Sequence, residues 1–305
     1  MDEISLEQLE SPIELVKWGH NGENQSKLPN ISINVSSPMT DRQAIARQEL
    51  LSAFNRLLQP ERFTDYGPNG LQVEGKAQIR KIVSGVTASR ALIEAAIFAK
   101  ADAIFVHHGL FWRGQTGVVT GWMKERLKLL LAHDINLFAY HLPLDAHPEL
   151  GNNAQLGKKL GFITPKAVER GEIQHFGDQS LGWMANVAQT SQNQPYLPEN
   201  LQKHLENTLK RPVTGVSIDK CTIKNIAWCT GGAQSYFEAA IAAGADAFIT
   251  GEMSEPQAHL ARECGVAYFA CGHHATERYG APAVTAFVTE KLSIEHQFIE
   301  IDNPA

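Results

Sequence analysis

Cysteine is scarce in this sequence, and the few cysteines are not arranged in pairs. Cys221, Cys229, Cys264 and Cys271 form no C-x-x-C motif and no regular disulfide spacing. This pattern argues against a disulfide framework. It predicts reduced thiols, as in a cytoplasmic protein.

Long apolar runs and an excess of positive charge are also missing. No apolar run reaches the roughly 18 residues that span a bilayer, so no membrane partner is expected. The opening residues, Met-Asp-Glu, lack the basic and apolar regions of a signal peptide. With a net charge of -6 and a pI ≈ 6.1, the chain lacks the basic surface of a generic nucleic-acid binder. We therefore expect a cytoplasmic protein that binds neither membranes nor nucleic acid polymers.

The motifs of several common enzyme classes do not occur either. The sequence contains no G-x-x-x-x-G-K-[ST], G-x-G-x-x-G, G-x-S-x-G or H-E-x-x-H. Their absence argues against nucleotide hydrolysis of the P-loop type and against serine hydrolase chemistry.

What the chain does contain is three groups of histidines and carboxylates, each following an apolar run that is typical of a buried strand. The three groups lie in segments 103–109, 137–147 and 270–278. Six of the twelve histidines lie in these segments, together with two carboxylates, and the candidate residues are His107, His108, His141, Asp145, His147, His273, His274 and Glu277.

The spacing within two of these groups suggests that their side chains share a metal ion. His273 and Glu277 are four residues apart, so on a helix both side chains leave the same face. An ordinary helix start with exposed polar residues is an equal alternative for that segment taken alone. His107 and His108 can converge only if their strand ends and the chain turns, which Gly109 permits.

Short apolar runs alternate with longer amphipathic stretches through the first part of the chain, which predicts an α/β fold. The expected helices are 44–59, 89–100 and 118–132, and the expected strands are 82–86, 103–107 and 136–140. The apolar side of the third helix is expected to carry Trp122, Met123, Leu127, Leu130 and Leu131. Ligands of such sheets gather beyond the carboxyl ends of the strands, where the histidine groups lie.

An internal repeat supports this organisation. When the chain is shifted so that Ile82 falls on Ile226, Ala101–Ala103 falls on Ala245–Ala247. The second copy carries Gly251-Glu252 where the first has His107-His108. The alternative is that alanine-rich helices before apolar strands resemble each other by composition alone.

We accordingly expect two similar interleaved α/β halves, an inserted subdomain between them and an N-terminal extension. The parts are a mobile N-terminal extension (1–42), a first half with metal ligands (43–162), the inserted subdomain (163–222) and a second half that completes the metal site (223–305).

The donor set favours divalent metal ions of borderline to hard character, such as Fe, Mn, Zn, Co or Ni. Three or four imidazoles with two carboxylates offer up to six ligands, which is more than one tetrahedral ion uses, whereas two ions bridged by a carboxylate would use them all. Such a pair activates water for hydrolysis. His141 is the candidate catalytic acid or base, and a role in orienting Asp145 is an equal alternative.

Other motifs carry two interpretations each. Asp145-Ala-His147 has the D-x-H spacing of metallophosphoesterases, or His147 bonds only its own loop. Thr230–Ser235 is an anion-binding turn or simply a tight turn. Phe111 and Trp112 stack a base or belong to the core.

Several of these motifs occur in the order found in one known family. They are Asn69-Gly-Leu-Gln-Val73, Val106-His-His-Gly109, His141-Leu-Pro-Leu-Asp145 with Gly151-Asn152, Thr230-Gly-Gly232 and Gly272-His-His-Ala-Thr-Glu277. From about residue 45 onward the chain resembles the GTP cyclohydrolase type 2 homologue family, also called Nif-three-like dinuclear metal-centre proteins.

The resemblance implies a toroidal homohexamer with two divalent metal ions in each subunit. It implies that His107 and His273 hold one metal, that His108 and Asp145 hold the other, and that Glu277 bridges them. It leaves two functions open. One is a metal-dependent hydrolase of a nucleotide or related heterocycle, and the other is a protein that stores or delivers metal ions without turnover.

Overall fold

The structure is a computed structural model that describes residues 44–187, 196–217 and 222–305. The predicted N-terminal extension, residues 1–42, lies outside the described residues.

The described part of the chain alternates helices and strands. Its helices are α1 (Arg47–Leu58), α2 (Arg90–Phe98), α3 (Gly121–Ala132), α4 (Leu142–Ala146), α5 (Asn152–Lys159), α6 (Pro165–Glu169), α7 (Pro198–Leu209), α8 (Phe237–Ala242), α9 (Glu255–Cys264), α10 (His273–Glu277) and α11 (Gly280–Leu292). Its strands are β1 (Ile45–Ala46), β2 (Gly70–Val73), β3 (Gln78–Ile79), β4 (Lys81–Thr87), β5 (Ala103–His108), β6 (Asn136–Ala139), β7 (Gln174–Phe176), β8 (Gly182–Asn186), β9 (Thr214–Val216), β10 (Asn225–Trp228), β11 (Ala247–Thr250), β12 (Ala267–Ala270) and β13 (Glu295–Phe298). The predicted α/β class is confirmed.

Local sequence explains several helix ends. The Ser89 hydroxyl accepts a hydrogen bond from the Leu92 N–H at 3.2 Å and caps the start of α2. Ser254 and Gln257 form a reciprocal capping box at the start of α9. Helix α1 ends at Gln59, which adopts a left-handed conformation directly before Pro60.

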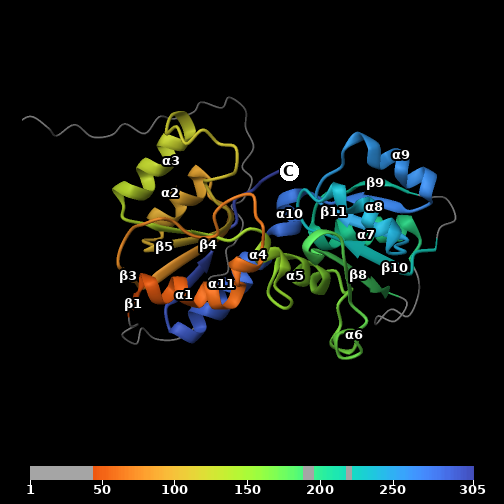
Figure 1. The fold of residues 1–305 in the computed structure, drawn as a ribbon, viewed down its shortest axis with the longest axis horizontal. Coiled ribbons are helices and arrows are strands. Elements are labelled where there is room, and N and C mark those ends of the chain that lie inside the picture. Colours follow the sequence, from red (N-terminus) through yellow and green to blue (C-terminus); the bar gives the residue numbers. More distant parts are fainter. Residues whose placement is uncertain (1–43, 188–195, 218–221) are drawn as a thin grey trace, which may run out of the picture. The chain divides into compact units, whose positions relative to one another are not determined.

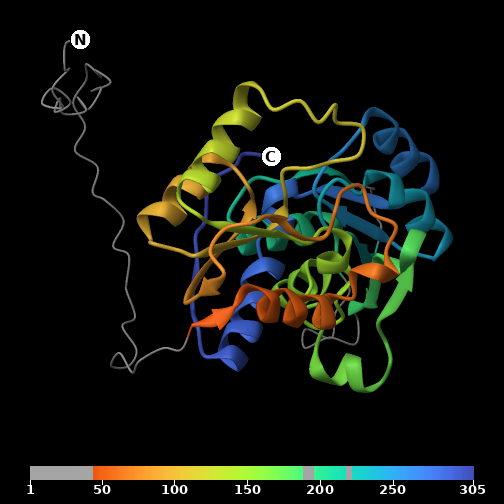
Figure 2. The same ribbon diagram turned by 60° about the vertical axis from the view of Figure 1, so that its left-hand side comes forward.

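The first sheet has the strand order β13-β4-β5-β6-β2, and only the edge strand β2 is antiparallel to its neighbour. Alternate residues of its strands face opposite sides, as the period of a strand requires. Phe105 packs with α1 and α11, whereas its neighbour Ile104 packs with α2 and α3. Figures 1 and 2 show these helix pairs on the two faces of the sheet.

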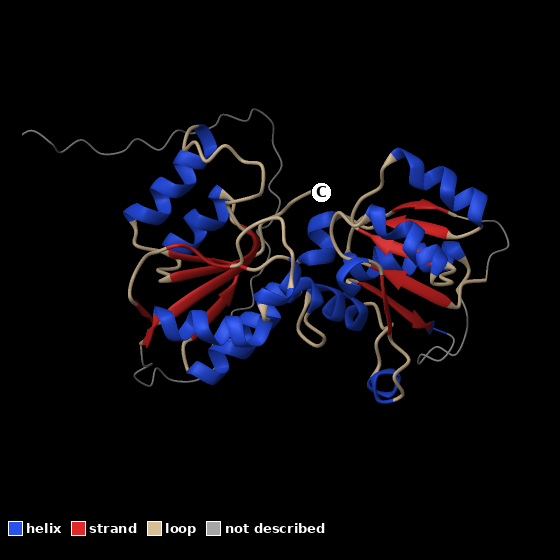
Figure 3. Cartoon of the chain, in the orientation of Figure 1, coloured by secondary structure: helices blue, strands red, loops and turns tan. Residues whose placement is uncertain are grey.

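The second sheet has the order β7-β8-β10-β11-β12-β9. Strands β10, β11 and β12 are parallel, and β8 and β9 flank them in the antiparallel direction. Helices α5 and α7 pack on one face through the cluster around Trp228, and α8 and α9 pack on the other through the cluster around Phe248. Figure 3 shows the two sheets in red.

Strand pairing runs across the boundaries that we predicted between segments. The stretch 163–222 supplies β7, β8 and β9 to the second sheet. Strand β13, near the end of the stretch 223–305, pairs in parallel with β4 of the first sheet. Both sheets are therefore assembled from pieces that are distant in the sequence.

The two stretches compared in the predicted repeat share a strand register and a side-chain contact. Ile82 pairs with Ala103 between β4 and β5, and Ile226 pairs with Ala247 between β10 and β11. The Asp102 carboxylate accepts hydrogen bonds of 2.8 and 3.2 Å from two backbone N–H groups at the start of β4. Asp246 accepts two of 2.8 Å at the start of β10. The shared Ala-Asp-Ala motif thus has the same structural role in both copies.

One detail of the predicted helix 118–132 is wrong. The helix begins at Gly121, and two residues that we expected on its apolar side, Trp122 and Leu131, are 57% and 59% exposed. Met123 and Leu130 are buried as expected. Across the described ranges, we find no helix that combines the length and the apolar character needed to cross a bilayer.

Candidate metal centre

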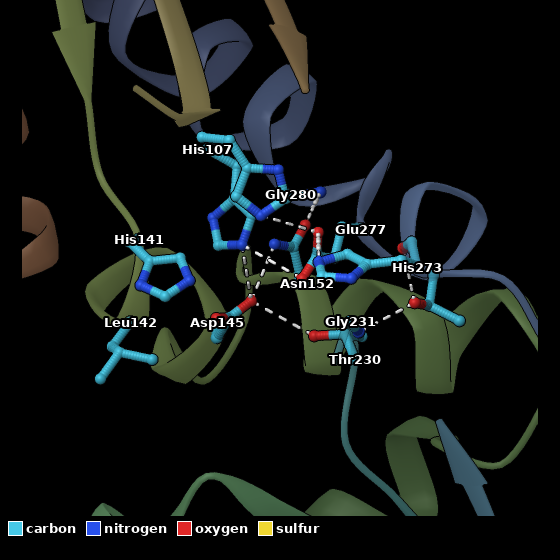
Figure 4. A network of polar contacts seen from close by, with 12 residues as sticks. His107, His141, Leu142, Asp145, Asn152, Thr230, Gly231, His273, Glu277 and Gly280 are labelled. Atoms are coloured by element: carbon cyan, nitrogen blue, oxygen red, sulfur yellow. Dashed lines mark hydrogen bonds and ion pairs between the residues drawn. The ribbon is translucent and has the colours of Figure 1, made fainter. Parts of the chain in front are cut away.

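The predicted ligands meet where the parallel strands of both sheets end (Figure 4). His107 and His108 are the last residues of β5, and His141 follows β6. His273 and Glu277 are the first and last residues of α10, which follows β12. The carboxyl ends of strands therefore gather the side chains, as the α/β architecture predicts.

Glu277 lies at the centre of the cluster. Its Oε1 is 3.3 Å from His107 Nε2, and its Oε2 is 3.2 Å from His108 Nε2 and 3.1 Å from His273 Nε2. The Asp145 Oδ1 atom lies 3.5 Å from His107 Nε2. One carboxylate thus contacts three of the imidazoles, which is the position expected of a bridging ligand.

The ligand atoms fall into groups that differ from those implied by the resemblance. One compact set is His107, Asp145 and Glu277, and a second is His108, His273 and Glu277. His107 is therefore grouped with Asp145 rather than with His273, and His108 with His273 rather than with Asp145. Glu277 belongs to both sets, as the resemblance implies. A third set joins His107, His108 and His141.

In two of the imidazoles, Nδ1 is hydrogen-bonded to an uncharged oxygen outside the cluster. His107 Nδ1 lies 3.1 Å from the backbone carbonyl of Tyr140 and can only donate to it, which leaves Nε2 facing the cluster. His108 Nδ1 lies 3.1 Å from the Thr87 hydroxyl.

The other two imidazoles are held by carboxylates. His141 Nδ1 donates to Asp65 at 2.6 Å, and His273 Nδ1 donates to Glu252 at 2.6 Å. In all four rings Nδ1 is thus engaged, and Nε2 is left for the cluster. This is the arrangement that outer hydrogen bonds give to metal-ligating histidines.

Asp145 is fixed by two polar neighbours. Asn152 Nδ2 and the Thr230 hydroxyl donate to its Oδ1 at 2.9 and 3.2 Å. Asn152 also accepts from the Gly280 N–H at 2.9 Å, which ties Asp145 to the start of α11. The orienting role that we weighed for His141 therefore belongs to Asn152 and Thr230.

Two buried atoms of the cluster have no hydrogen-bond partner within the part of the chain that the structure describes. They are His107 Nε2 and Glu277 Oε2. Both lie close to oppositely charged groups without satisfying hydrogen-bond geometry. Buried polar atoms are almost always satisfied, and a bound ligand would satisfy both of these.

Electrostatics inside the cluster are strongly perturbed. Burial alone lowers the pKa of His107, but Asp145 and Glu277 outweigh it and raise that pKa to about 9. For His108 burial prevails over the attraction of Glu277 and lowers the pKa to about 3. Burial raises the pKa of Glu277, yet His108 and His107 hold it well below its usual value. Glu277 is therefore an ionised carboxylate in a buried position.

A glycine makes room for this carboxylate. Gly231 has a φ of 72°, and a methyl group added to it would overlap Glu277 Oε1. The turn after β10 can approach the cluster this closely only because the residue has no side chain.

Two of the weaker motifs make hydrogen bonds within the protein itself. His147 Nδ1 accepts hydrogen bonds from two N–H groups of its own loop, at 3.1 and 3.2 Å. Within Thr230–Ser235, the N–H groups of Thr230, Gly231 and Ala233 all donate to side chains of the protein. These amides are therefore not free to hold an anion.

Sequence reasoning missed the residues that orient the imidazoles. Asp65 lies in a loop rich in turn dipeptides and gave no chemical signal of its own. Glu252 was visible only as the counterpart of His108 in the second copy of the repeat. Thr87 ends a strand without any motif. Such residues are defined by what they contact in space, which the sequence does not display.

Comparison with known families gives one match that covers most of the chain. The profile of Duf34/NIF3 (NGG1p interacting factor 3) matches residues 45–304.

Named relatives agree with this match. A Pseudomonas aeruginosa protein named GTP cyclohydrolase 1 type 2 homolog is 48% identical over 262 residues, covering 86% of this chain and 100% of the relative. A Neisseria meningitidis protein of the same name is 47% identical over 261 residues, with the same coverage of both chains. Among solved structures, protein ybgI, described as of unknown function, is 44% identical, with a TM-score of 0.77, and covers 86% of this chain and 100% of its own.

Proposed function

Because this chain belongs to the Duf34/NIF3 family, we propose that it binds two divalent metal ions at the Glu277 cluster and hydrolyses a nucleotide or related heterocycle there. The observation that carries the proposal is the orientation of the four imidazoles. Each ring uses Nδ1 for an outer oxygen and leaves Nε2 for the cluster. Bound ions would also satisfy the buried His107 Nε2 and Glu277 Oε2 atoms, which have no hydrogen-bond partner among the described residues.

The donor set fits such ions. His107, Asp145 and Glu277 would hold one ion, and His108, His273 and Glu277 the other. Imidazole and carboxylate donors without thiolate suit Fe, Mn, Zn, Co or Ni. Bound ions of this kind lower the pKa of coordinated water toward about 7 and polarise a substrate oxygen.

His141 is the residue that we assign to proton transfer. Asp65 fixes its Nδ1–H, so the exchangeable position is Nε2. The Asp65 carboxylate is itself held by Asn69 Nδ2 at 2.9 Å and by the Leu142 N–H at 2.9 Å. His141 is thus kept in one orientation beside His107, with ring centroids 4.9 Å apart.

We further propose that the protein works as a toroidal homohexamer in the cytoplasm. The resemblance of its motifs to the family supports the assembly. The unpaired state of Cys229, Cys264 and Cys271 is compatible with a reducing compartment. Light scattering after size-exclusion chromatography measures the number of subunits directly.

The first experiment is elemental analysis of protein purified without added metal, alongside turnover of a nucleotide panel that includes GTP. We expect about two ions per chain, following the two ligand sets, and turnover of one nucleotide. The Glu277→Gln variant should lose both ions because its carboxylate belongs to both sets. Glu263→Gln, at an exposed position of α9, is the matched control and should retain them.

Each other outcome has a defined meaning. Loosely held ions without turnover would favour the storage or delivery function over hydrolysis. Full metal occupancy in Glu277→Gln would remove the bridging role. A wild-type protein without metal, even after addition of the five candidate ions, would overturn the metal centre itself.

A further inference from the structure

A pocket of about 460 Å³ opens beside the metal cluster and is not explained by metal binding. His108 and His273 form part of its wall, and Tyr66, Trp112, Trp122 and Arg126 form much of the rest. Its volume lies within the range of small-molecule sites, roughly 300 to 1,000 Å³. An aromatic pocket that touches the cluster is a natural place for the organic part of a substrate.

The aromatic side chains here are exposed more than core packing would leave them. Tyr66 and Trp122 are 60% and 57% exposed. The Trp112 ring meets His141 edge to face, with centroids 5.0 Å apart, and lies 6.0 Å from His108. These rings give the pocket beside the cluster flat apolar surface, which is the surface that stacks on planar heterocycles.

Arg126 supplies the positive charge of this pocket. Its guanidinium carbon lies 4.8 Å from the centre of the Trp122 ring. The side chain is half-buried, and burial lowers the pKa of the guanidinium. Within residues 44–187, 196–217 and 222–305, no carboxylate forms an ion pair with it. A partly desolvated guanidinium without a counterion is well suited to a phosphate or carboxylate of a ligand.

A second, smaller pocket on the cluster differs in charge. It has a volume of about 180 Å³, and Asp145, Asp178 and Glu277 line it. Tyr66 and His141 belong to the walls of both pockets. Bound ions would neutralise Asp145 and Glu277, so Arg126 in the wall of the larger pocket is the group that orients an anionic ligand.

We propose that the larger pocket binds a planar heterocycle that carries a phosphate group, of the nucleoside monophosphate class. The ring stacks against Trp112 and Trp122, the phosphate binds Arg126, and the edge of the ring faces His108 and His273. This inference names the substrate class of the proposed hydrolase and rests on that function for its chemistry. Binding itself can be tested separately.

The test measures binding of AMP, GMP, adenosine and inorganic phosphate to the full-length metal-loaded protein, by calorimetry and by quenching of tryptophan fluorescence. Arg126→Met should lower the affinity for AMP and GMP about 10- to 100-fold, because it removes one charge-assisted contact. The affinity for adenosine, which has no phosphate, should not change. Lys128→Met removes a charge from an exposed position of the same helix and should leave the affinities for nucleotides and for adenosine unchanged. Trp122→Ala should lower both affinities by about 5- to 100-fold.

Several results would overturn the proposal. One is a wild-type protein that binds no nucleotide at millimolar concentration. Another is a Lys128→Met variant that loses as much nucleotide affinity as Arg126→Met. A third is inorganic phosphate that binds as tightly as AMP. A Trp122→Ala protein that changes its number of subunits without losing nucleotide affinity would instead assign this surface to subunit contacts. Circular dichroism verifies that each variant is folded.

The same measurements separate this inference from the proposed function. Nucleotide binding that survives chelation of metal, together with no turnover of any nucleotide, would overturn the hydrolase and leave the pocket assignment standing. Turnover that proceeds with unchanged affinity in Arg126→Met would overturn the pocket and leave the hydrolase standing.

Discussion

Each imidazole of the cluster is oriented by an oxygen on the far side of its ring. His273 shows this most clearly, because its partner Glu252 occupies the place that His108 has in the first copy of the repeat. The first copy uses this strand end to supply candidate ligands, whereas the second uses it to orient the candidate ligand His273. Orientation of this kind usually changes metal affinity by about 10- to 100-fold.

At Gly231 the absence of a side chain is itself a requirement of the site. Gly231→Ala should displace Glu277 and reduce the metal content, because the added methyl group overlaps Oε1. Elemental analysis of the purified variant measures this loss.

Gly244→Ala is the matched control for that change. Gly244 also has a positive φ, of 87°, but open space surrounds its missing Cβ. Both variants should lose about 1–2 kcal/mol of stability from the left-handed backbone, whereas only Gly231→Ala should lose metal. Equal metal contents would show that the Glu277 carboxylate is not constrained by the turn.

His296 predicts a pH dependence of stability away from the cluster. Its Nε2 lies 2.7 Å from the Ser84 hydroxyl, and burial lowers its pKa to about 4. Between about pH 6.5 and pH 4, this histidine is protonated in the unfolded chain, where its pKa is about 6.5, but remains neutral in the folded protein. Stability is therefore highest above about pH 6.5 and is lost as the pH falls toward 4.

The comparison of two histidine variants isolates this effect. Between about pH 7.5 and pH 5, the midpoint of thermal unfolding should fall less in His296→Gln than in the wild type, because the variant lacks the depressed histidine. His133→Gln, at an exposed position, should follow the wild type. Parallel curves for all three proteins would refute the prediction.

At the scale of secondary-structure elements, the two copies of the predicted repeat share one contact, in which an aspartate accepts hydrogen bonds at the start of a strand. Asp102→Ala and Asp246→Ala should each lower the free energy of unfolding by about 1.5–3 kcal/mol, since each removes a charged acceptor from two backbone N–H groups. Urea unfolding measures both. Asp302→Ala, at an exposed position, should cost much less, and equal losses at all three sites would contradict a specific role.

The elements were predictable where one periodicity dominated. The strands before His107 and His141 and the helices α1 and α2 follow from apolar spacing and lie within a few residues of their predicted ends. Helix α3 was misjudged because spacing identifies an apolar side but does not show what covers it. Trp122 faces a pocket instead of a core.

The candidate site was predictable only in its inner members. Residue types and spacing identified a wider group of candidates, and the resemblance to the family selected five of them, namely His107, His108, Asp145, His273 and Glu277. Their grouping could not be derived, because it depends on how the ends of the two sheets approach each other.

At the scale of the whole molecule, the first 42 residues are expected to be dispensable for assembly. The Pseudomonas aeruginosa relative aligns over 100% of its length with only 86% of this chain, and the family profile begins at residue 45. A chain that begins at residue 43 should therefore keep the number of subunits found in the full-length protein, as measured by light scattering. Dissociation on truncation would show that the extension takes part in assembly.

The distribution of the ligands has a consequence for the lifetime of the protein. His107 and His108 end a strand of the first sheet, whereas His273 follows a strand of the second. A bound ion would therefore act as a cross-link between distant parts of a chain whose described cysteines are all unpaired. Since a ligand that binds only the folded state resists unfolding, metal supply would set how readily proteases degrade this protein.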